Sequence, residues 1–410
     1  MVSKYGSRLS LSALSGYLMV AVMALAGSKS SLAFQSEGTV RIGMLESQTG
    51  TYAPFGLANM WGTLIAINEI NAAGGVLVDG VKVKIAVTPS PGGYDAGGDP
   101  AQSVALLKRL LVDDKVLMIK GLSNSNAGTA VFNYLAELEK EGTPIVVHSS
   151  SVGTPGLTKL SNYAFRNSFV ENAEVVNNLI SVVLKGTGAK SAAFFITRDN
   201  PYYTTVAEKI MIPALKAAGV DVKVTMDAVT SDRELSRQVN EIRAANPDLV
   251  FVMAPTLSTV NFMKEAKRRQ LKPKLFVGNQ STLTTEAMQS GAEAIDGIVA
   301  AGAFDPQSPQ IATISTEYRK QANQDISFYV VMGYEAGYMI KDAIERSGIK
   351  NVADTVSGDR KKFRDAFAVT SITSPVGLKA AFNVDRETPK SGVVLVARGG
   401  RFVIWNGTDK

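Results

Sequence analysis

The chain has 410 residues, a formal net charge of +6, one histidine and no cysteine. The lack of cysteine excludes disulfide bonds, thiol nucleophiles and a lipid attached at a signal-peptide cysteine. The charge excess is small, and no basic stretch is interleaved with aromatic residues, so we expect no nucleic-acid partner. A single histidine without cysteine provides no histidine–cysteine ligand set, and we predict neither a metal nor a cofactor.

The N-terminal 33 residues are predicted to be a signal peptide. Lys4 and Arg8 are basic, residues 9–26 are mostly apolar, and residues 31–33 include the small side chains that signal peptidase accepts. We therefore predict cleavage after Ala33 and a periplasmic protein. A membrane anchor is the alternative, but serines and a glycine interrupt the apolar stretch, which is short for a span of about 20 apolar residues. The remaining length suits two lobes rather than one core.

A strand, a helix and a second strand are predicted next. Residues 40–45 and 81–87 are short apolar stretches, the second after a turn at Asp79-Gly80. Residues 55–70 have helical spacing, and the glycines at 74 and 75 favour the left-handed conformation that ends a helix. This βαβ unit implies a parallel sheet, and open α/β sheets bind ligands at the carboxyl ends of their strands. One buried helix face is expected, formed by Leu57, Met60, Trp61, Leu64 and Ile65.

The string RIGMLESQTGTYAPFG at residues 41–56, with Gly62 and INAAGG at residues 70–75, resembles the opening of the leucine/isoleucine/valine-binding protein family. Members are extracytoplasmic solute-binding proteins of ABC importers. The resemblance continues through most of the mature chain. It implies the type I periplasmic-binding fold, an α/β class in which two doubly wound parallel-sheet lobes are joined by a three-segment hinge. We expect lobe 1 to contain residues 34–168 and 299–390, and lobe 2 residues 169–298 and 391–410.

The later chain alternates strands and helices, as this fold requires. In the first lobe we predict strands at residues 116–119 and 145–148, and helices that begin at Asp99-Pro100 and at Thr129. The strand at residues 297–302 is expected to return the chain to the first lobe. The closing hairpin of residues 393–396 and 402–405 is placed in the second lobe by analogy. Second-lobe strands are predicted at 192–196, 222–224, 249–253 and 275–277, and helices at 173–184, 202–218, 231–245 and 258–270.

A polar loop between the strand at 116–119 and the following helix is the first candidate site. Asn124 and Ser125 offer amide and hydroxyl groups there, and a helix N-terminus favours a carboxylate through its free N–H groups and its dipole. Plain N-capping is the alternative that the residues alone favour. The family resemblance implies that Ser125 holds the ligand carboxylate.

Four further first-lobe positions are implied by the resemblance. Phe55 stands where family members often have an aromatic residue that contacts the ligand side chain. Ser151, Val152 and Gly153 follow the strand at 145–148, where the family usually has an alanine-threonine pair, so a threonine hydroxyl is missing here. His148, at the end of that strand, is expected to be a packed residue rather than a catalyst.

Three second-lobe positions complete the expected ligand site. Tyr202 matches a family tyrosine that closes over the ligand, although a surface tyrosine is the alternative. Thr256 and Gln280 each follow a predicted strand. At the position of Gln280, many amino-acid-binding relatives have an acid that pairs with the ligand ammonium. A neutral amide lacks that charge-assisted strength, so the ligand is expected to be a branched-chain type of amino acid held differently, or a related small carboxylate.

The expected function is that of a monomeric binding protein that closes over a small ligand and delivers it to ABC-transporter permease subunits. An enzyme is disfavoured because the chain has one histidine, no cysteine and no GxSxG motif. A sensor or regulator of the same fold, for amides or organic acids, is the alternative. The glycine- and proline-rich loop at residues 89–100 departs from the family pattern, and we predict no role for it.

Overall fold

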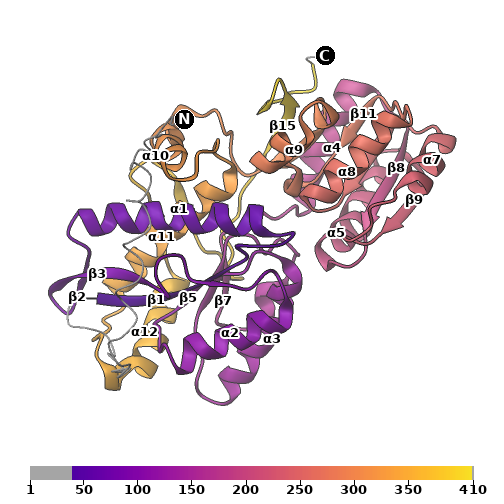
Figure 1. The fold of residues 1–410 in the computed structure, drawn as a ribbon. Coiled ribbons are helices and arrows are strands. Elements are labelled where there is room, and N and C mark those ends of the chain that lie inside the picture. Colours follow the sequence, from indigo (N-terminus) through magenta and orange to yellow (C-terminus); the bar gives the residue numbers. More distant parts are fainter. Residues whose placement is uncertain (1–38, 409–410) are drawn as a thin grey trace, which may run out of the picture.

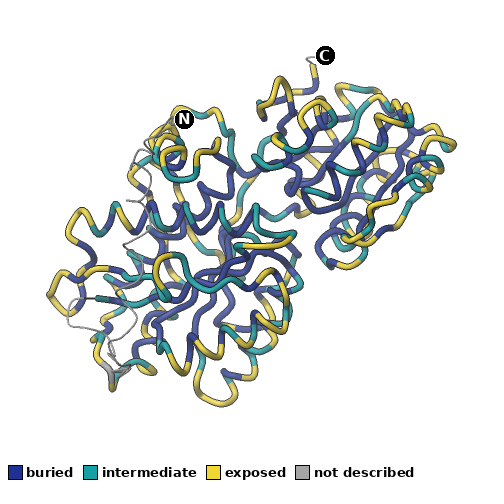
Figure 2. The backbone as a smooth tube through the Cα atoms, viewed as in Figure 1, coloured by how far each residue is buried: buried dark blue, intermediate teal, exposed yellow. Residues whose placement is uncertain are grey.

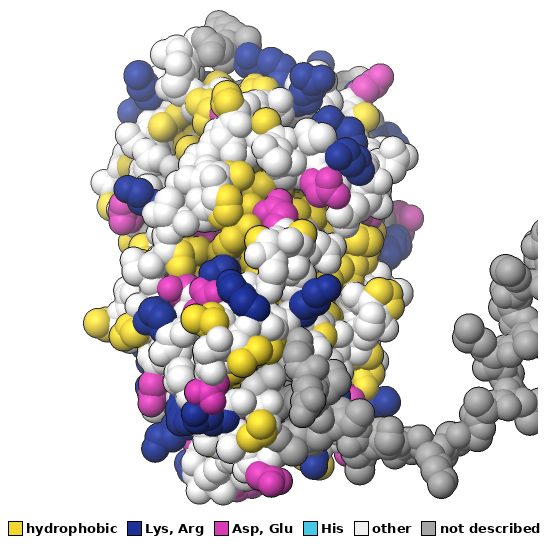
Figure 3. Space-filling model, turned by 90° about the vertical axis from the view of Figure 1, so that its left-hand side faces the viewer, with side chains coloured by type: hydrophobic (Ala, Val, Ile, Leu, Met, Phe, Trp, Pro, Cys, Tyr) yellow, Lys and Arg dark blue, Asp and Glu magenta, His cyan; other side chains and the backbone are white. Residues whose placement is uncertain are grey.

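The computed structural model describes residues 39–408, so the predicted signal peptide and its cleavage after Ala33 lie outside the described residues. Two α/β lobes lie side by side, with helix α1 (Ala53–Ala72) along the first and strands β8 (Ser191–Thr197) and β9 (Asp221–Ala228) in the second (Figure 1). Within residues 39–408, no helix is both long and apolar enough to cross a membrane. On the face in Figure 3, basic and acidic side chains are interspersed, in keeping with the small net charge.

The first lobe is built on a seven-stranded sheet in the order β2–β3–β1–β5–β6–β7, with β4 also paired to β1. All of its pairings are parallel except that of β2 with β3, so the predicted parallel sheet is confirmed. Its strands are β1 (Thr39–Glu46), β2 (Val76–Val78), β3 (Val81–Thr88), β4 (Tyr94–Asp95), β5 (Ile119–Gly121), β6 (Val147–Ser149) and β7 (Ala164–Arg166). Helices α2 (Pro100–Val112), α3 (Ser125–Lys140), α10 (Ala312–Ala322), α11 (Phe328–Arg346) and α12 (Val356–Ala368), and hairpin β13 (Ser371–Thr373)–β14 (Lys379–Ala381), accompany α1.

The predicted βαβ unit is present, with one addition. Strand β1 runs parallel to β3 with Thr39 opposite Lys84, and α1 connects them. Gly74 and Gly75 have φ angles of +99° and +87°, the left-handed values expected after the helix. The predicted Asp79-Gly80 turn joins β3 to a short antiparallel strand, β2, that the sequence pattern did not reveal.

The second lobe contains another seven-stranded sheet, in the order β16–β15–β12–β11–β10–β8–β9. Its central strands pair in parallel, whereas β15 and β16 form an antiparallel hairpin at one edge. Besides β8 and β9, its strands are β10 (Leu249–Met253), β11 (Leu275–Val277), β12 (Val299–Gly302), β15 (Val393–Arg398) and β16 (Arg401–Ile404). Its helices are α4 (Ala173–Thr187), α5 (Pro201–Thr205), a π-helical turn (Val206–Met211), α6 (Ile212–Ala217), α7 (Ser236–Ala245), α8 (Thr256–Arg268) and α9 (Thr285–Ile295).

The expectation that residues 297–302 return the chain to the first lobe is wrong. Strand β12 pairs in parallel with β11 and antiparallel with β15, so it belongs to the second sheet. The chain therefore leaves the second sheet only after Gly302, and the boundary expected at residue 299 is too early. An apolar strand that ends one sheet has the same residue pattern as one that begins another, so only the pairing distinguishes them.

The first and third connections between the sheets lie side by side. Arg166 and Glu387 form an ion pair with Nη2 and Oε1 2.5 Å apart, and the backbone N–H of Thr388 donates to the Arg166 carbonyl at 3.1 Å. Lys390 and the buried Glu335 of α11 form a second ion pair at 2.8 Å. These contacts fix the base of the hinge to the first lobe.

His148 is packed, as predicted. Its ring lies edge-on to Phe367 and Phe382, with centroid distances of 5.1 and 5.8 Å. Burial, reinforced by the positive charges of Lys120 and Lys390, holds the pKa of His148 well below its usual value, so the imidazole is neutral.

Helix α1 is buried on more than the one predicted face. Leu57, Trp61 and Leu64 are only partly buried, whereas the polar Asn59 and Thr63 are completely buried. The reason is that α1 lies against α11 as well as the sheet (Figures 1 and 2). The partner helix comes from a distant part of the sequence and could not be read from the spacing within α1.

Gly62 lets α1 and α11 approach each other closely. A Cβ placed on Gly62 would lie 2.0 Å from the Val330 carbonyl oxygen, a contact that side-chain rotation cannot relieve. We expect Gly62→Ala to lower the free energy of unfolding by about 1–3 kcal/mol, because the helices must separate. Urea unfolding followed by circular dichroism measures this change.

Gly358 provides the matched control for that substitution. It is also a helical glycine, on α12, but is exposed, and a Cβ there meets no atom within 4 Å. Gly358→Ala should stabilise the protein by about 0.4–1 kcal/mol through the lower conformational entropy of the unfolded chain. Equal effects of the two substitutions would contradict the close-packing argument.

Candidate functional site: an interlobe cleft

A small cavity lies between the lobes at the carboxyl ends of the strands. Its volume is about 20 Å³, which is room for about one water molecule, so a solute can enter only when the lobes separate. Among the predicted site residues, Phe55, Asn124, Ser125, Ser151, Tyr202 and Gln280 line the cavity. The other lining residues, which the sequence analysis missed as ligand contacts, are Tyr52, Ser123, Asn200, Tyr203, Ser281 and Tyr329.

The start of α3 forms the first-lobe side of the cleft. The helix begins at Ser125, four residues earlier than predicted, with Asn124 as its N-cap. Asn124 Oδ1 accepts from the Ala127 N–H at 3.0 Å and its Nδ2 donates to the Gly98 carbonyl, so the capping alternative is correct for this residue. Ser125 Oγ accepts from the Thr154 N–H at 3.2 Å, which leaves its own O–H to donate to another group.

A buried ion pair lies behind this wall. Lys120 Nζ is 3.0 Å from Glu46 Oε1, and both side chains are completely buried. Ser123, which lines the cavity, donates to the other Glu46 oxygen at 2.8 Å and accepts from the Ser47 N–H at the same distance. The loop before α3 is therefore fixed to the end of β1.

The serine-rich loop after β6 contributes less than the resemblance implied. Val152 does not line the cavity, because its side chain packs against Gly128, and its carbonyl accepts from Arg166 and Ser168. Gly153 lies behind the lining residues, where an added Cβ would be 2.7 Å from Gln280 Nε2 and 3.0 Å from the Tyr202 ring. Gly153 thus permits the second lobe to come close.

Tyr202 is buried in the cleft, so the surface alternative is wrong. Asn200 caps α5 by accepting from the Tyr202 N–H at 3.0 Å. This bond fixes the backbone position from which the Tyr202 side chain extends. The Tyr202 hydroxyl donates to Glu171 Oε2, and its ring lies edge-on to Tyr203 at 5.0 Å. Tyr203 in turn lies 3.2 Å from the Ser281 hydroxyl.

Gln280 faces the cleft, whereas Thr256 does not. Gln280 lies in the short turn after β11, and its side-chain Oε1 is buried without a hydrogen-bond partner. Thr256, at the start of α8, donates to the Ser281 carbonyl at 2.8 Å and is absent from the cavity wall. Thr256 therefore supports the Gln280–Ser281 turn from behind.

Two hydrogen bonds join the lobes across the cleft. Asn200 Nδ2 donates to the Tyr52 hydroxyl at 3.1 Å, and Asn126 Nδ2 donates to the Asp199 carbonyl at 2.7 Å. These bonds involve one polar group from each lobe, so each is made only when the lobes approach. The sequence held no signal for either pairing beyond the placement of Tyr52 and Asn200 at strand ends.

Glu171 is a buried acid beside this cleft that the sequence analysis did not single out. It lies in the first hinge connection and is completely buried, and its Oε1 has no hydrogen-bond partner. Burial raises the pKa of Glu171 to about 8, although a hydrogen bond from the Gln280 backbone N–H acts in the opposite direction. No ion pair links Glu171 to a described lysine, arginine or histidine.

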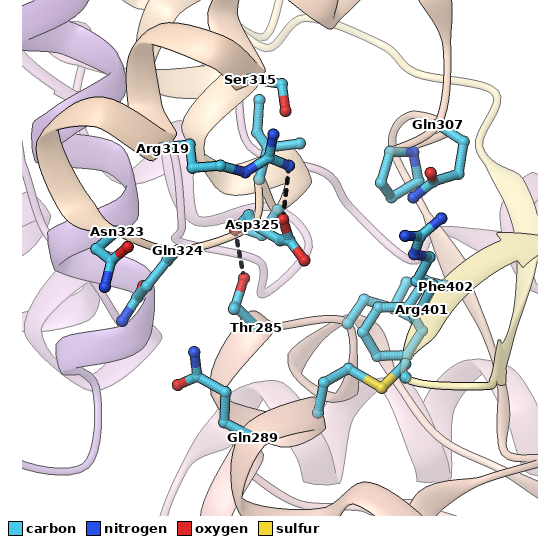
Figure 4. Close-up of a pocket in the computed structure, with 16 residues that line it drawn as sticks. Thr285, Gln289, Gln307, Ser315, Arg319, Asn323, Gln324, Asp325, Arg401 and Phe402 are labelled. Carbon is cyan, nitrogen blue, oxygen red and sulfur yellow. Dashed lines mark hydrogen bonds and ion pairs between the residues drawn. The ribbon is translucent and has the colours of Figure 1, made fainter.

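A much larger cavity lies elsewhere and has a different character. It has a volume of about 470 Å³ and is bounded by α9, the β15–β16 turn and the loop between α10 and α11 (Figure 4). Arg319 and Asp325 form an ion pair at 2.7 Å on its wall, and both side chains are more than half exposed. None of the predicted site residues lines this cavity, so we assign the candidate site to the smaller cleft.

Known proteins with the same architecture bind small carboxylates. A family model described as "Periplasmic binding protein" matches residues 39–397. The leucine-, isoleucine-, valine-, threonine- and alanine-binding protein of Pseudomonas aeruginosa is 24% identical over 365 residues, covering 88% of this chain and 89% of that protein. Two solved structures share the fold. The branched-chain amino acid transporter substrate-binding protein LivJ of Streptococcus pneumoniae, in complex with isoleucine, has a TM-score of 0.74 and 21% identity, over 89% of this chain and 97% of its own.

The second solved structure contains a different ligand. It is a solute-binding protein of an ABC transporter from R. palustris in complex with benzoate, with a TM-score of 0.74 and 18% identity over 90% of this chain and 96% of its own. Together these likenesses confirm the predicted two-lobe α/β fold.

Proposed function

This chain belongs to the periplasmic binding protein family, and we propose that it is the solute-binding component of an ABC importer that takes an amino acid or related small carboxylate. The resemblance to leucine/isoleucine/valine-binding proteins is thereby confirmed, and the relatives are solute-binding proteins rather than enzymes. The family implies an extracytoplasmic location. Delivery to permease subunits, the monomeric state and the ligand remain part of the proposal.

The observation that carries this proposal is Ser125 at the start of α3, facing the cavity. Its hydroxyl is free to donate, and the first turn of a 16-residue helix presents N–H groups and a positive dipole end to an anion. Isoleucine and benzoate, the ligands in the two solved structures, share only a carboxylate among their polar groups. We propose that Ser125 and the α3 N-terminus hold this carboxylate, and that Phe55, Ser151, Tyr202 and Gln280 contact the rest of the ligand.

Binding is proposed to shift a population of open and closed forms. A ligand in the cleft contacts both lobes only in the closed form, so it stabilises that form by its additional contacts. The Tyr52–Asn200 and Asn126–Asp199 hydrogen bonds support such closure. For the lobe division we propose residues 39–168 and 303–390 against residues 169–302 and 391–408, crossing at three segments.

A thermal-shift screen of the purified, refolded protein tests the ligand class. The panel contains leucine, valine and phenylalanine, their 2-oxo and plain carboxylate analogues, benzoate, urea and short amides. A ligand at one hundred times its Kd should add about 2.7 kcal/mol of apparent stability. Ser125→Ala should remove most of the shift caused by any carboxylate. A shift only with amides, or an unchanged shift in Ser125→Ala, would contradict carboxylate binding at α3.

Gly153→Val should prevent full closure. The three atoms nearest to an added Cβ all belong to Gln280 and Tyr202 of the other lobe, so the clash arises only when the lobes meet. Overpacking of about 1–3 kcal/mol corresponds to roughly 5–150-fold weaker binding of the best panel ligand. Titration calorimetry measures the affinity, and small-angle X-ray scattering measures the contraction on binding. Because the atoms nearest to the added Cβ belong to the other lobe, the ligand-free stability should change little, and a misfolded variant would show that this reasoning is wrong.

A further inference from the structure

Among the buried side-chain oxygen atoms without hydrogen-bond partners are three carboxylate or amide oxygens near the cleft. They are Oε1 of Glu171, Oε1 of Gln280 and Oδ1 of Asn59. Buried polar atoms are hydrogen-bonded in the great majority of cases, so a group of unpaired ones indicates a partner that the protein itself does not supply. With Glu171 ionised, all three atoms are acceptors, and the partner they require is a donor.

Gln280 lines the cleft, and Glu171 and Asn59 each contact a residue that lines it. The Gln280 amide and the Tyr202 ring both lie against Gly153. The Tyr202 hydroxyl reaches Glu171, and Asn59 Nδ2 donates to Ser151, two residues before Gly153. The hinge, α1 and the turn after β11 therefore each bring one polar group against the residues of the cleft wall.

Resting on the proposed carboxylate site, we propose that Glu171 supplies the negative charge that Gln280 lacks, and that the ligand is an α-amino acid whose ammonium group is held at Glu171. An ammonium group has three N–H donors and no acceptor, which matches the unpaired oxygens of Glu171, Gln280 and Asn59. A buried carboxylate without a counterion is costly, so a cation beside it gives the strongest discrimination for amino acids over their deaminated analogues.

Ammonium binding is coupled to a proton. The groups that face Glu171 are Tyr202 and Tyr203 from α5, Tyr329 from α11 and the Gln280 backbone N–H, and none carries a positive charge. The pKa of Glu171, raised by burial to about 8, keeps the carboxyl protonated at pH 7 in the closed cleft. A neighbouring ammonium lowers that pKa, so an amino acid should expel one proton into the buffer as it binds.

Calorimetry of the wild type and of Glu171→Gln tests this assignment. The probes are leucine and 4-methylpentanoate, its deaminated analogue, and valine and phenylalanine with theirs. For the wild type at pH 7, titration in buffers of different ionisation enthalpy should show about one proton released with the amino acid and none with the analogue. Glu171→Gln preserves the shape of the side chain but cannot ionise. It should bind the amino acid on the order of 100-fold more weakly, release no proton, and bind the analogue within about threefold of wild type.

The matched control is Glu286→Gln. The Glu286 pKa is also raised by burial, but this residue lies on α9, and unlike Glu171 it has no hydrogen bond to a residue that lines the cleft, so both probes should bind to this variant as they bind to wild type. Equal amino-acid affinity in wild type and Glu171→Gln would overturn the assignment and leave the importer proposal intact. Binding of only the deaminated acids would do the same. If no member of either series binds, the carboxylate site and the assignment both fail.

Discussion

Replacing Lys120 by methionine should lower the free energy of unfolding by about 3–5 kcal/mol, the usual cost of leaving a buried charge without its partner. Lys120 and Glu46 are both completely buried, with Nζ and Oε1 3.0 Å apart. After the substitution, Glu46 retains only the Ser123 hydroxyl as a side-chain donor. Because Ser123 lines the cleft, ligand affinity should fall as well.

A double substitution separates the lost charge pair from lost packing. Lys120→Met with Glu46→Gln removes both charges and keeps an amide oxygen for Ser123, so it should be more stable than Lys120→Met alone by about 2 kcal/mol or more. Trp61, on α1, is one of two tryptophans. In a Trp405→Phe background it is the sole tryptophan, and its fluorescence during unfolding reports on the lobe that contains the affected sheet. A double variant no more stable than Lys120→Met would show that packing, not the unpaired charge, causes the loss.

The sequence was most informative where local chemistry decides the structure. Gly74 and Gly75 end α1 in the left-handed conformation, and the strand-to-loop positions of Ser125 and Gln280 place them at the carboxyl edges of the two sheets, facing one cavity. Each of these features depends on a few neighbouring residues and on the general rule for parallel sheets. The resemblance to the family over most of the chain then predicted that the two sheets form two lobes around one ligand site.

The features that were missed depend on contacts between distant parts of the chain. Asn59 and Thr63 are buried because α11, about 270 residues later, packs on α1. Strand β12 could be assigned to its sheet only through β11 and β15. Glu171 directly precedes the N-cap Asn172, and an acid at a helix start is ordinarily a solvated partner of the helix dipole. Glu171 differs from such an acid because it is completely buried and accepts a hydrogen bond from the Tyr202 hydroxyl of α5.

That burial leads to an expected pH dependence in the ligand-free protein. The folded-state pKa of Glu171 is raised from 4.5 to about 8, so the folded form binds more protons than the unfolded form between these values. Stability from this group is fully present below pH 4.5 and is lost as pH rises toward 8. Between pH 4.5 and pH 7 the loss amounts to about 3 kcal/mol, at 1.36 kcal/mol per unit of pKa difference.

Glu171→Gln should therefore match wild type near pH 4.5 and exceed it by about 3 kcal/mol at pH 7 in the absence of ligand. Urea unfolding at a series of pH values measures the difference, in which contributions from all other groups cancel. Glu265 supplies a control of opposite sign, because the hydrogen bond from Arg268 lowers the pKa of its carboxyl. Glu265→Gln should be less stable than wild type at neutral pH, and this difference should disappear as the pH falls. A difference between Glu171→Gln and wild type that does not grow with pH would mean that Glu171 is ionised without ligand. Glu171 therefore lowers the stability of the ligand-free protein at neutral pH, and a bound ammonium group removes this cost. Such an acid is consistent with selection for the ligand rather than for stability.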